Sequence, residues 1–304
     1  MTDIPALSAQ IHELAKEREA VILAHNYQRA EVQDVADFVG DSLGLSRQAA
    51  ATDASVIVFA GVHFMAETAK ILAPAKTVLL PEPRAGCPMA DMITGEALHA
   101  WKAEHRGVAV VTYVNSSAEV KAESDVCVTS ANAVAVVRAL GASHILFAPD
   151  CNLGHWVARS LPDVTVDLWE GWCPTHDRVT PEQVLAAREA HPDALVMAHP
   201  ECRPEVVDLA DAVLSTSQML NYAATAPAEE FVVVTEAGLI HGLAKAAPGK
   251  RFFELSPRME CPNMKATTLQ KVHDCLANGT GEVEVPQGVS ARALAAVEKM
   301  IAIG

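Results

Sequence analysis

Short apolar runs alternate with longer amphipathic stretches along the whole chain. Three of these runs end in polar residues, in the segments AVILAHNYQ, VAVVTYVNSS and ALVMAHPEC. Apolar runs of this length are typical of strands buried on both faces of a parallel sheet, and the stretches between them have the period of helices. The pattern predicts an α/β fold in which right-handed helical crossovers join parallel strands.

The same pattern occurs three times at nearly constant spacing. The polar strand ends begin at His25, Tyr113 and His199, which are 88 and 86 residues apart. Hydroxyl residues that precede helical stretches recur with this period, at Ser42, Ser130 and Ser215–Ser217. A third set of apolar runs, each of which opens a helical stretch, also recurs with this period: SVIVFAGVHF, HILFAPDCNL and FVVVTEAGLI. Recurrence at a fixed period indicates one structural unit used three times.

Each unit is predicted to be a three-layer α/β/α domain with its own parallel sheet. The predicted boundaries are residues 1–106 for the first unit, 107–192 for the second and 193–283 for the third. Residues 284–304 are expected to join the first unit as a strand and a helix capped by Ser290. The N-terminal segment SAQIHELAKERE is predicted to be a helix that leads into the first unit.

Composition and charge exclude several classes of protein. Half of the 304 residues are hydrophobic and a fifth are charged, as in a compact globular protein. No apolar run approaches the roughly 18 residues of a membrane span, and the N-terminus lacks the apolar stretch of a signal peptide. We therefore expect a cytoplasmic protein without membrane contact. A formal net charge of -15 argues against a nucleic-acid partner.

Three cysteines are each followed by proline and repeat with the period of the units. Cys87, Cys173 and Cys261 are 86 and 88 residues apart. Seven cysteines in a cytosolic chain favour metal binding or catalysis over a disulfide framework. Because each unit supplies one cysteine at the same place, we expect three thiolates at a common metal centre. Three ligands leave one coordination position open, which is typical of a catalytic centre.

The sequence identifies the candidate ligands more clearly than the metal that they bind. Structural zinc sites usually contain closely spaced cysteine pairs, which this chain lacks, and a zinc enzyme with three separated cysteines is an open alternative. A [4Fe-4S] cluster held by three thiolates would keep one iron free to act as a Lewis acid, and we favour this interpretation. The other cysteines do not follow the period and are interpreted as small buried side chains: Cys127, Cys151, Cys202 and Cys275.

The repeated polar residues are expected to meet at one edge of each sheet. In open parallel sheets, ligands bind beyond the carboxyl ends of the strands, where helix N-termini offer unpaired amides. Ser42, Ser130 and the pair Ser215–Thr216 are placed to hold carboxylate or phosphate oxygens there. Any one of these hydroxyls could simply cap its helix. Their repetition at matched positions favours a shared binding site.

The chain resembles the quinolinate synthase (NadA) family through motifs spread over nearly its whole length. These motifs are Ala24–Gln28, Gly40–Ser42, Gly86–Pro88, Tyr113–Asn115, Thr129–Asn132, Cys173–His176, His199–Cys202, Ser215–Thr216 and Met259–Lys265. The resemblance implies three homologous domains around a pseudo-threefold axis, with the active site and a [4Fe-4S] cluster in the central cavity. It further implies an enzyme that condenses iminoaspartate with dihydroxyacetone phosphate to quinolinate in de novo NAD biosynthesis.

The resemblance also implies roles for individual residues. The cluster ligands would be Cys87, Cys173 and Cys261. Substrate carboxylates and phosphate would be held by His25, Ser42, Ser130, His199, Ser215 and Thr216. Proton transfer would involve Tyr27, Tyr113, Glu201 and His176, of which Tyr113 and Glu201 would also contact substrate, while Asn115 would orient an intermediate. An L-aspartate oxidase that supplies iminoaspartate is the expected functional partner.

Three other functions are compatible with the residues alone. A cluster-dependent hydro-lyase could use the same thiolates on a different hydroxy acid. A cluster carrier would bind the same cofactor without a reaction of its own. A zinc enzyme would contain neither iron nor sulfide.

Overall fold

The computed structural model describes residues 3–303 and contains three sheets, each of four parallel strands. The first sheet, in the order β2-β1-β3-β4, contains β1 (Ala20–His25), β2 (Phe38–Gly40), β3 (Val56–Ala60) and β4 (Thr77–Leu79). The second, in the order β6-β5-β7-β8, contains β5 (Ala109–Tyr113), β6 (Val126–Val128), β7 (His144–Ala148) and β8 (Thr165–Leu168). The third, in the order β10-β9-β11-β12, contains β9 (Leu195–Ala198), β10 (Ala212–Val213), β11 (Glu230–Val234) and β12 (Arg251–Glu254).

Helices connect the strands in the predicted order. The crossovers of the first sheet are α2 (Ala30–Asp34), α3 (Ser42–Ala51) and α4 (His63–Leu72). Those of the second are α6 (Ala118–Ala122), α7 (Ala133–Leu140) and α8 (Cys151–Ser160). Those of the third are α11 (Pro204–Val207), α12 (Thr216–Thr225) and α13 (Leu239–Ala246). Each sheet is preceded by one further helix, namely α1 (Ile4–Glu17), α5 (Gly95–Glu104) and α10 (Pro181–Ala190).

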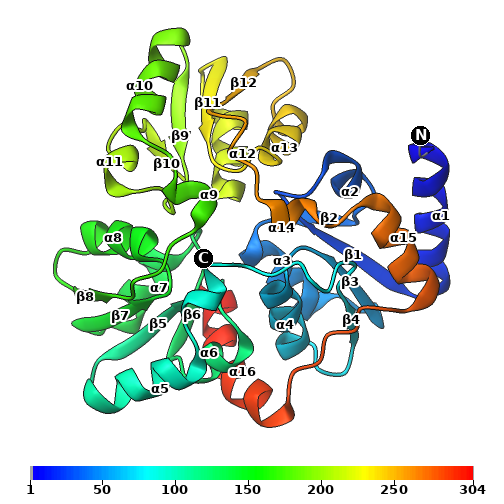
Figure 1. The fold of residues 1–304 in the computed structure, drawn as a ribbon, viewed down its shortest axis with the longest axis horizontal. Coiled ribbons are helices and arrows are strands. Elements are labelled where there is room, and N and C mark those ends of the chain that lie inside the picture. The colour runs from blue at the N-terminus through cyan, green and yellow to red at the C-terminus, as the bar shows by residue number, and fades with distance from the viewer. Residues whose placement is uncertain (1–2, 304) are drawn as a thin grey trace.

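A short helical turn follows each of the three repeated cysteines. These turns are η1 (Ala90–Met92), α9 (Pro174–Asp177) and α14 (Pro262–Lys265), and the chain ends with α15 (Leu269–Asn278) and α16 (Gln287–Ala302). Figure 1 shows the result as three lobes, each built around one sheet. The predicted α/β architecture with three parallel sheets is confirmed, whereas the pseudo-threefold axis and the domain boundaries stay predictions.

Helices cover both faces of each sheet. On one face, α1 and α15 pack against the first sheet, α5 and α6 against the second, and α10 and α11 against the third, each through its own cluster of buried apolar side chains. The opposite faces of all three sheets contribute to one large shared core. This continuous core joins the three lobes into one body.

A repeated aspartate that the sequence analysis missed supports the duplication. In each lobe a carboxylate just before the second strand accepts a hydrogen bond of 2.7 Å from an amide near the start of the first strand: Asp37 from Ile22, Asp125 from Val110 and Asp211 from Val196. The carboxylate satisfies a strand amide that would otherwise lack a partner. The aspartates are 88 and 86 residues apart, the same intervals as those between the polar strand ends.

The predicted hydroxyl caps are only partly correct. Ser215 is the N-cap of α12 and forms a capping box with Gln218. The N-cap of α3 is Asp41, which accepts from the Gly44 amide, so Ser42 is the first helical residue. The N-cap of α7 is Asn132. Two of the three repeated hydroxyls are therefore not used as caps.

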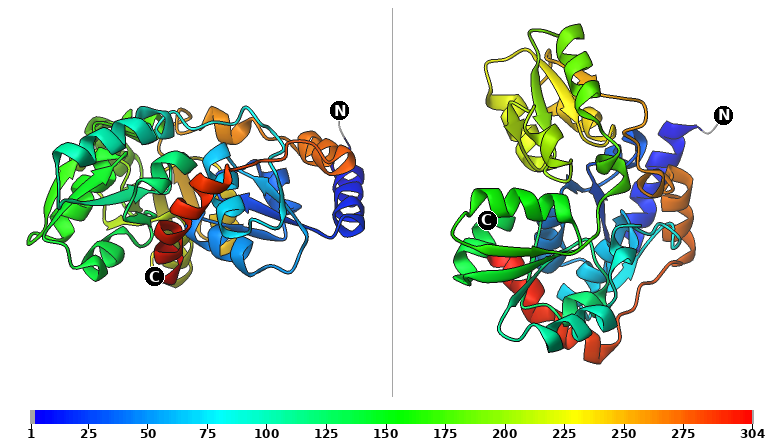
Figure 2. Two further views of the ribbon diagram at one scale, coloured as in Figure 1. Left: turned by 90° about the horizontal axis from the view of Figure 1, so that it is seen from below. Right: turned by 60° about the vertical axis from the view of Figure 1, so that its left-hand side comes forward.

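The C-terminal part of the chain returns to the first lobe. Helix α15 packs beside α1, and α16 packs against α3 and α4 of the first lobe as well as α6 and β6 of the second (Figure 2). Between them, Gly281 and Val283 exchange backbone hydrogen bonds with the end of β4. Gly281 is required there, because its φ is 83° and a Cβ would lie 2.3 Å from the Leu80 oxygen.

Two details of the predicted C-terminal segment are wrong. The expected strand is reduced to a single antiparallel bridge between Glu282 and Leu79. The last helix begins at Gln287, directly after Pro286, so Ser290 lies inside its first turn and is not the cap. Proline fixes φ in a range compatible with helix entry, and here it determines where the helix begins. Among residues 3–303, no helix has both the length and the apolar character that a bilayer crossing requires.

Candidate functional site

One cavity of about 140 Å³ is lined by residues from all three lobes. Thirteen of the fourteen predicted site residues line it: His25, Tyr27, Ser42, Cys87, Tyr113, Asn115, Ser130, Cys173, His176, His199, Glu201, Thr216 and Cys261. Ser215 does not, because its fully buried side chain caps α12. The carboxyl ends of the strands thus bring together residues that are far apart in the sequence, as expected for parallel sheets.

The three cysteines lie in equivalent loops between the last strand of a sheet and the next long helix. We name these the Cys87 loop (residues 80–94), the Cys173 loop (169–180) and the Cys261 loop (255–268). Cys173 and Cys261 are the N-caps of α9 and α14. In every loop, backbone amides two or three residues further along favour the ionised sulfur: those of Met89 and Ala90, of His176, and of Asn263 and Met264.

Burial dominates the acidity of all three thiols. Removal from water raises the pKa of Cys87 to about 12, and it raises the pKa values of Cys173 and Cys261 as well. The charge of Glu201 adds to the effect at Cys87 and Cys173. Cys87 also interacts electrostatically with both other thiols, so the three sulfurs share one electrostatic environment. Without a metal the thiols keep their protons, and metal binding would displace them.

Several observations fit a metal cluster in this cavity. Three thiols from three lobes line the same space, and amides are directed at each sulfur, as expected for a cluster with three thiolate ligands. In addition, the shielded Asn115 oxygen at the cavity wall has no hydrogen-bond partner among the described residues. The donor set therefore fits a cluster that leaves one position for another ligand.

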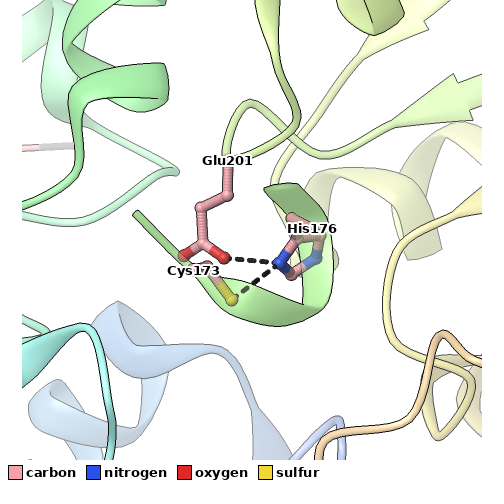
Figure 3. Close-up of side chains that lie close together, drawn as sticks. All are labelled: Cys173, His176 and Glu201. Carbon is pink, nitrogen blue, oxygen red and sulfur yellow. Dashed lines mark hydrogen bonds and ion pairs between the residues drawn. The ribbon is translucent and has the colours of Figure 1, made fainter. Parts of the chain in front are cut away.

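Cys173, His176 and Glu201 form a second possible metal-binding group. Their ligand atoms all lie within 4.8 Å of one another (Figure 3). However, His176 Nδ1 is already 2.7 Å from Glu201 Oε2 and 3.2 Å from Cys173 Sγ. These contacts satisfy the group without a metal. A single ion there would also leave Cys87 and Cys261 unused.

A chain of hydrogen bonds connects two tyrosines across the cavity. The Tyr113 hydroxyl donates to Glu201 Oε1 at 2.6 Å, and the other Glu201 oxygen contacts His176 Nδ1. On its far side, His176 Nε2 lies 2.9 Å from Thr235 Oγ1, which lies 2.6 Å from the Tyr27 hydroxyl. These hydrogen bonds join residues of all three lobes. It provides continuous contacts along which protons can move.

The electrostatics of this chain keep a buried carboxylate ionised. Burial opposes ionisation of Glu201, but the nearby His176 ring and the hydrogen bond from the Tyr113 hydroxyl hold its pKa below the ordinary value. Burial, reinforced by the charge of Glu201, raises the pKa values of Tyr27 and Tyr113 well above their usual range. At neutral pH both tyrosines are therefore protonated donors beside an anionic Glu201.

Two histidines are held as neutral hydrogen-bond donors. Burial lowers the pKa of His25 to about 3 and that of His199 to about 4. His25 Nδ1 accepts from the Tyr27 amide at 3.1 Å, and His199 Nδ1 accepts from the Glu201 amide at 3.3 Å. Because Nδ1 accepts in each neutral ring, the proton is on Nε2. His199 Nε2 lies 3.1 Å from the Ser130 hydroxyl, which it can donate to.

Sequence reasoning missed several residues at this site. Thr235 and Glu236 follow β11, and Arg178 lies where the cavity approaches the surface. Asn26 donates to the Thr216 hydroxyl at 2.9 Å and joins the first and third lobes. The signal for Thr235 and Glu236 was present, since polar residues directly follow a strand run already identified as repeated. Thr235 has no polar counterpart in the other units, and Glu236 has an acidic counterpart only in the second, which hid them.

The remaining cysteines do not line the cavity. Cys127, Cys202 and Cys275 are buried as predicted, whereas Cys151 at the start of α8 is partly exposed. Cys202 donates weakly to the Val234 oxygen and packs in the core of the third lobe. None of these four residues lies among the cavity-lining groups.

Comparison with known proteins assigns the chain to a family. Residues 9–302 match the family model described as "Quinolinate synthetase A protein". The chain is 53% identical to "Quinolinate synthase" of Methanoregula boonei over the full length of both proteins. It is 54% identical to proteins of the same name from Geobacter sp. strain M21 and Dehalococcoides mccartyi, covering 98% of this chain and 97% and 98% of theirs. With its three-lobed fold and shared cavity, the chain belongs to the quinolinate synthetase A protein family.

Proposed function

We propose that the protein is a quinolinate synthase that condenses iminoaspartate with dihydroxyacetone phosphate. The products are quinolinate, one phosphate and two waters, which together account for all atoms of the substrates. The observation that carries the proposal is the cavity in which three thiols, two neutral histidines and two tyrosines from three lobes meet. Family membership and the names of the relatives support the same activity.

The cofactor we propose is a [4Fe-4S] cluster held by Cys87, Cys173 and Cys261. When bound, it supplies a Lewis acid through an iron that has no thiolate ligand, which suits the removal of hydroxyl groups as water. The backbone amides directed at the sulfurs stabilise the thiolates that such binding requires.

The anionic groups of the substrates are held by neutral donors. His25 and His199 present Nε2–H groups, and Ser42, Ser130 and Thr216 add hydroxyls around the same cavity. Ser215 contributes through the end of α12 that it caps. Asn115 orients an intermediate through a donor on that intermediate; in support, its shielded oxygen has no hydrogen-bond partner among residues 3–303.

Proton transfers use the chain of hydrogen bonds between the tyrosines. Tyr113 is a donor whose proton can be replenished through Glu201, and Tyr27 receives or returns a proton through Thr235 and His176. The ionised Glu201 favours the protonated form of each neighbour. Apolar side chains in the cavity wall, including Val62, Phe64 and Met264, limit access of water to imine and enol intermediates.

The test is an anaerobic assay of the reconstituted protein. Iminoaspartate, generated in place by an L-aspartate oxidase, is mixed with dihydroxyacetone phosphate, and quinolinate is measured together with iron and sulfide. We expect quinolinate only when the cluster is present, and rapid loss of activity in air. A protein that contains the cluster but forms no quinolinate would indicate a different hydro-lyase or a cluster carrier. A colourless protein that contains zinc would indicate a zinc enzyme. The oxidase partnership and the cytoplasmic location stay predictions.

A further inference from the structure

A buried ion pair that the proposed chemistry does not use lies beside the cavity. Lys265 Nζ is 2.7 Å from Glu236 Oε1, with the Glu236 side chain fully buried and that of Lys265 only 11% exposed. Glu236 follows β11, and Lys265 is the last residue of α14 in the Cys261 loop. Buried ion pairs are costly to form and need further hydrogen bonds to be stable. The other hydrogen bonds of Glu236 and Lys265 therefore indicate which parts of the site the pair stabilises.

Both members of the pair bond backbone groups at the site. Glu236 Oε1 accepts from the Cys261 amide at 3.0 Å, and Glu236 Oε2 accepts from the Gly238 amide at 2.7 Å. Lys265 Nζ also donates to the backbone oxygen of Tyr27 in the first lobe. The pair thus connects the backbone of a proposed cluster ligand with the backbone of a proposed proton-transfer residue.

The chain approaches this ion pair closely at Gly238. A Cβ on Gly238 would lie 2.6 Å from Lys265 Nζ, 2.7 Å from the Tyr27 oxygen and 2.8 Å from Glu236 Oε2. The φ of Gly238 is -59°, which any residue can adopt, so glycine is needed for space alone. Any larger side chain would push against all three partners at once.

The Cys261 loop is only partly buried around the cysteine. Around the cysteine, Arg258, Glu260 and Pro262 are exposed, while Met259 and Met264 are buried. Outside the ion pair, Arg29 of the first lobe donates to the Lys265 backbone oxygen at 2.9 Å. Other hydrogen bonds reach the loop from the Ala237 amide to the Met259 oxygen at 2.7 Å and from Gln28 to the Met264 sulfur at 3.5 Å. The ion pair differs from these contacts because it is charged and accepts a hydrogen bond from the Cys261 amide itself.

We propose that the Glu236–Lys265 ion pair is a positioning device that fixes the third cluster ligand and Tyr27 relative to each other. It acts through the backbone of Cys261, whose amide bonds Glu236, and of Tyr27, whose oxygen bonds Lys265. The inference rests on the proposed function, because it assigns Cys261 and Tyr27 the roles given there. Its central consequence, a Cys261 loop that loosens when the pair is broken, can be measured without cofactor or substrate.

The experiment compares variants of the cluster-free protein. Lys265→Met keeps the length of the side chain and removes its charge, Glu236→Gln keeps an acceptor for the Cys261 amide, and the double variant tests whether the two effects are coupled. Gly238→Ala disturbs the pair without removing either charge. The matched control is Lys245→Met, because Lys245 forms an ion pair with Asp34 that also joins the third and first lobes but is exposed.

The main readout is the rate at which iodoacetamide modifies each cysteine, resolved by peptide mass spectrometry. We expect Lys265→Met and Gly238→Ala to speed modification of Cys261 at least about tenfold, because local opening exposes the sulfur. Loss of a nearby cation alone disfavours the thiolate and would slow the reaction, so acceleration reports movement of the loop. Hydrogen exchange of peptides covering residues 256–266 should rise in parallel. Lys245→Met should leave both rates unchanged.

A second readout uses the reconstituted protein. We expect a chelator to remove iron from Lys265→Met faster than from Lys245→Met, and the double variant to lose iron more slowly than Lys265→Met, because it has no unpaired buried carboxylate. Equal rates for Lys265→Met and Lys245→Met in both readouts would overturn the inference. So would an equal acceleration at Cys127 and Cys173, which would indicate general unfolding. A wild-type protein that binds the cluster but makes no quinolinate would instead overturn the proposed function.

Discussion

The Cys173 loop and the Cys261 loop are equivalent in the sequence repeat but are held in place differently. Two residues after β7, Asp150 lies near the Cys173 amide, and two residues after β11, Glu236 accepts from the Cys261 amide. Among residues 3–303, Asp150 has no cationic partner, and its burial and the charge of Glu201 raise its pKa well above the ordinary value. Glu236 is paired with Lys265.

The difference teaches that two loops at matched positions of a sequence repeat can be held in place by different contacts. Cys173 contacts His176 and belongs to a compact group with Glu201, all within one connected set of hydrogen bonds. The Cys261 loop is held instead by the Glu236–Lys265 ion pair within the third lobe and by hydrogen bonds with Tyr27 and Arg29 of the first lobe. We therefore expect changes at the Cys173 loop mainly to lower turnover. We expect changes at the Cys261 loop mainly to displace the cysteine.

The largest expected effect is the loss of either cysteine. Cys173→Ala and Cys261→Ala should each abolish iron binding and quinolinate formation, because two thiolates cannot retain the cluster. Iron and sulfide analysis after anaerobic reconstitution measures this. The control variants Cys127→Ala and Cys275→Ala should keep the cluster, since these residues lie outside the cavity lining. If Cys173→Ala or Cys261→Ala alone retained iron, the two cysteines would not be equivalent as cluster ligands.

The next effect concerns the acidic group at the Cys173 loop. Glu201→Gln removes the charge that contacts His176 while keeping an acceptor for Tyr113. We expect turnover to fall by about 10²–10⁴-fold, the usual contribution of a proton-transfer group, with the cluster retained. Steady-state kinetics and iron content measured on the same sample check both parts. Unchanged turnover would remove Glu201 from the proton path.

A smaller effect is expected where the chain of hydrogen bonds crosses to the third lobe. Thr235→Val removes the hydroxyl between His176 and Tyr27 and preserves the shape of the side chain. With about 1 kcal/mol for each of two hydrogen bonds, turnover should fall by about 10- to 100-fold. The Cys261 alkylation rate should not change, which separates this variant from Lys265→Met. A change in alkylation would mean that the two supports are coupled.

The smallest effect tests the electrostatic support of the segment after Cys261. Lys271 of α15 forms an ion pair with Glu82 of the Cys87 loop, and this pair lowers the pKa of Glu82 to about 2. Because the pKa of Glu82 is lower in the folded state than its ordinary value of 4.5, the ionised carboxylate stabilises the folded state fully above pH 4.5. This stabilisation is lost as pH falls toward 2.

We therefore expect Glu82→Gln to lower the free energy of unfolding by about 1 kcal/mol at pH 7. The difference from wild type should shrink as pH falls below about 4.5. Urea unfolding between pH 3 and pH 7 measures the difference. A constant difference across this range would show that the contact is not electrostatic.

The repeat made most of the fold predictable. Strand runs such as AVILAH and HILFA each contain three consecutive large apolar residues, and the spacing of these runs correctly predicted three parallel sheets. Periodicity could not predict where α15 and α16 pack. An amphipathic helix shows that one face is buried but does not identify the partner. The first lobe and the boundary with the second bury these helices.

The site was predictable where residues repeat and hidden where they do not. The cysteines, His25 at the end of β1 and His199 directly after β9 have counterparts at matched positions, so their convergence could be inferred. Thr235 corresponds to Gly61 and Pro149, and Glu236 corresponds to Val62 and Asp150, so neither residue belongs to a polar position that repeats in all three lobes. The distinction between Ser215, which caps its helix, and Ser130, which lines the cavity, depends on backbone geometry that sequence does not show.

The return of the last segments to the first lobe has a consequence for synthesis of the protein. Helix α15 packs beside α1, and Gly281 and Val283 bond the end of β4. A ribosome makes the first lobe first but releases these segments last. The lobe that is translated earliest is therefore completed only after the third lobe has been made. A nascent chain that has not yet emerged beyond residue 283 still lacks the contacts that close this lobe.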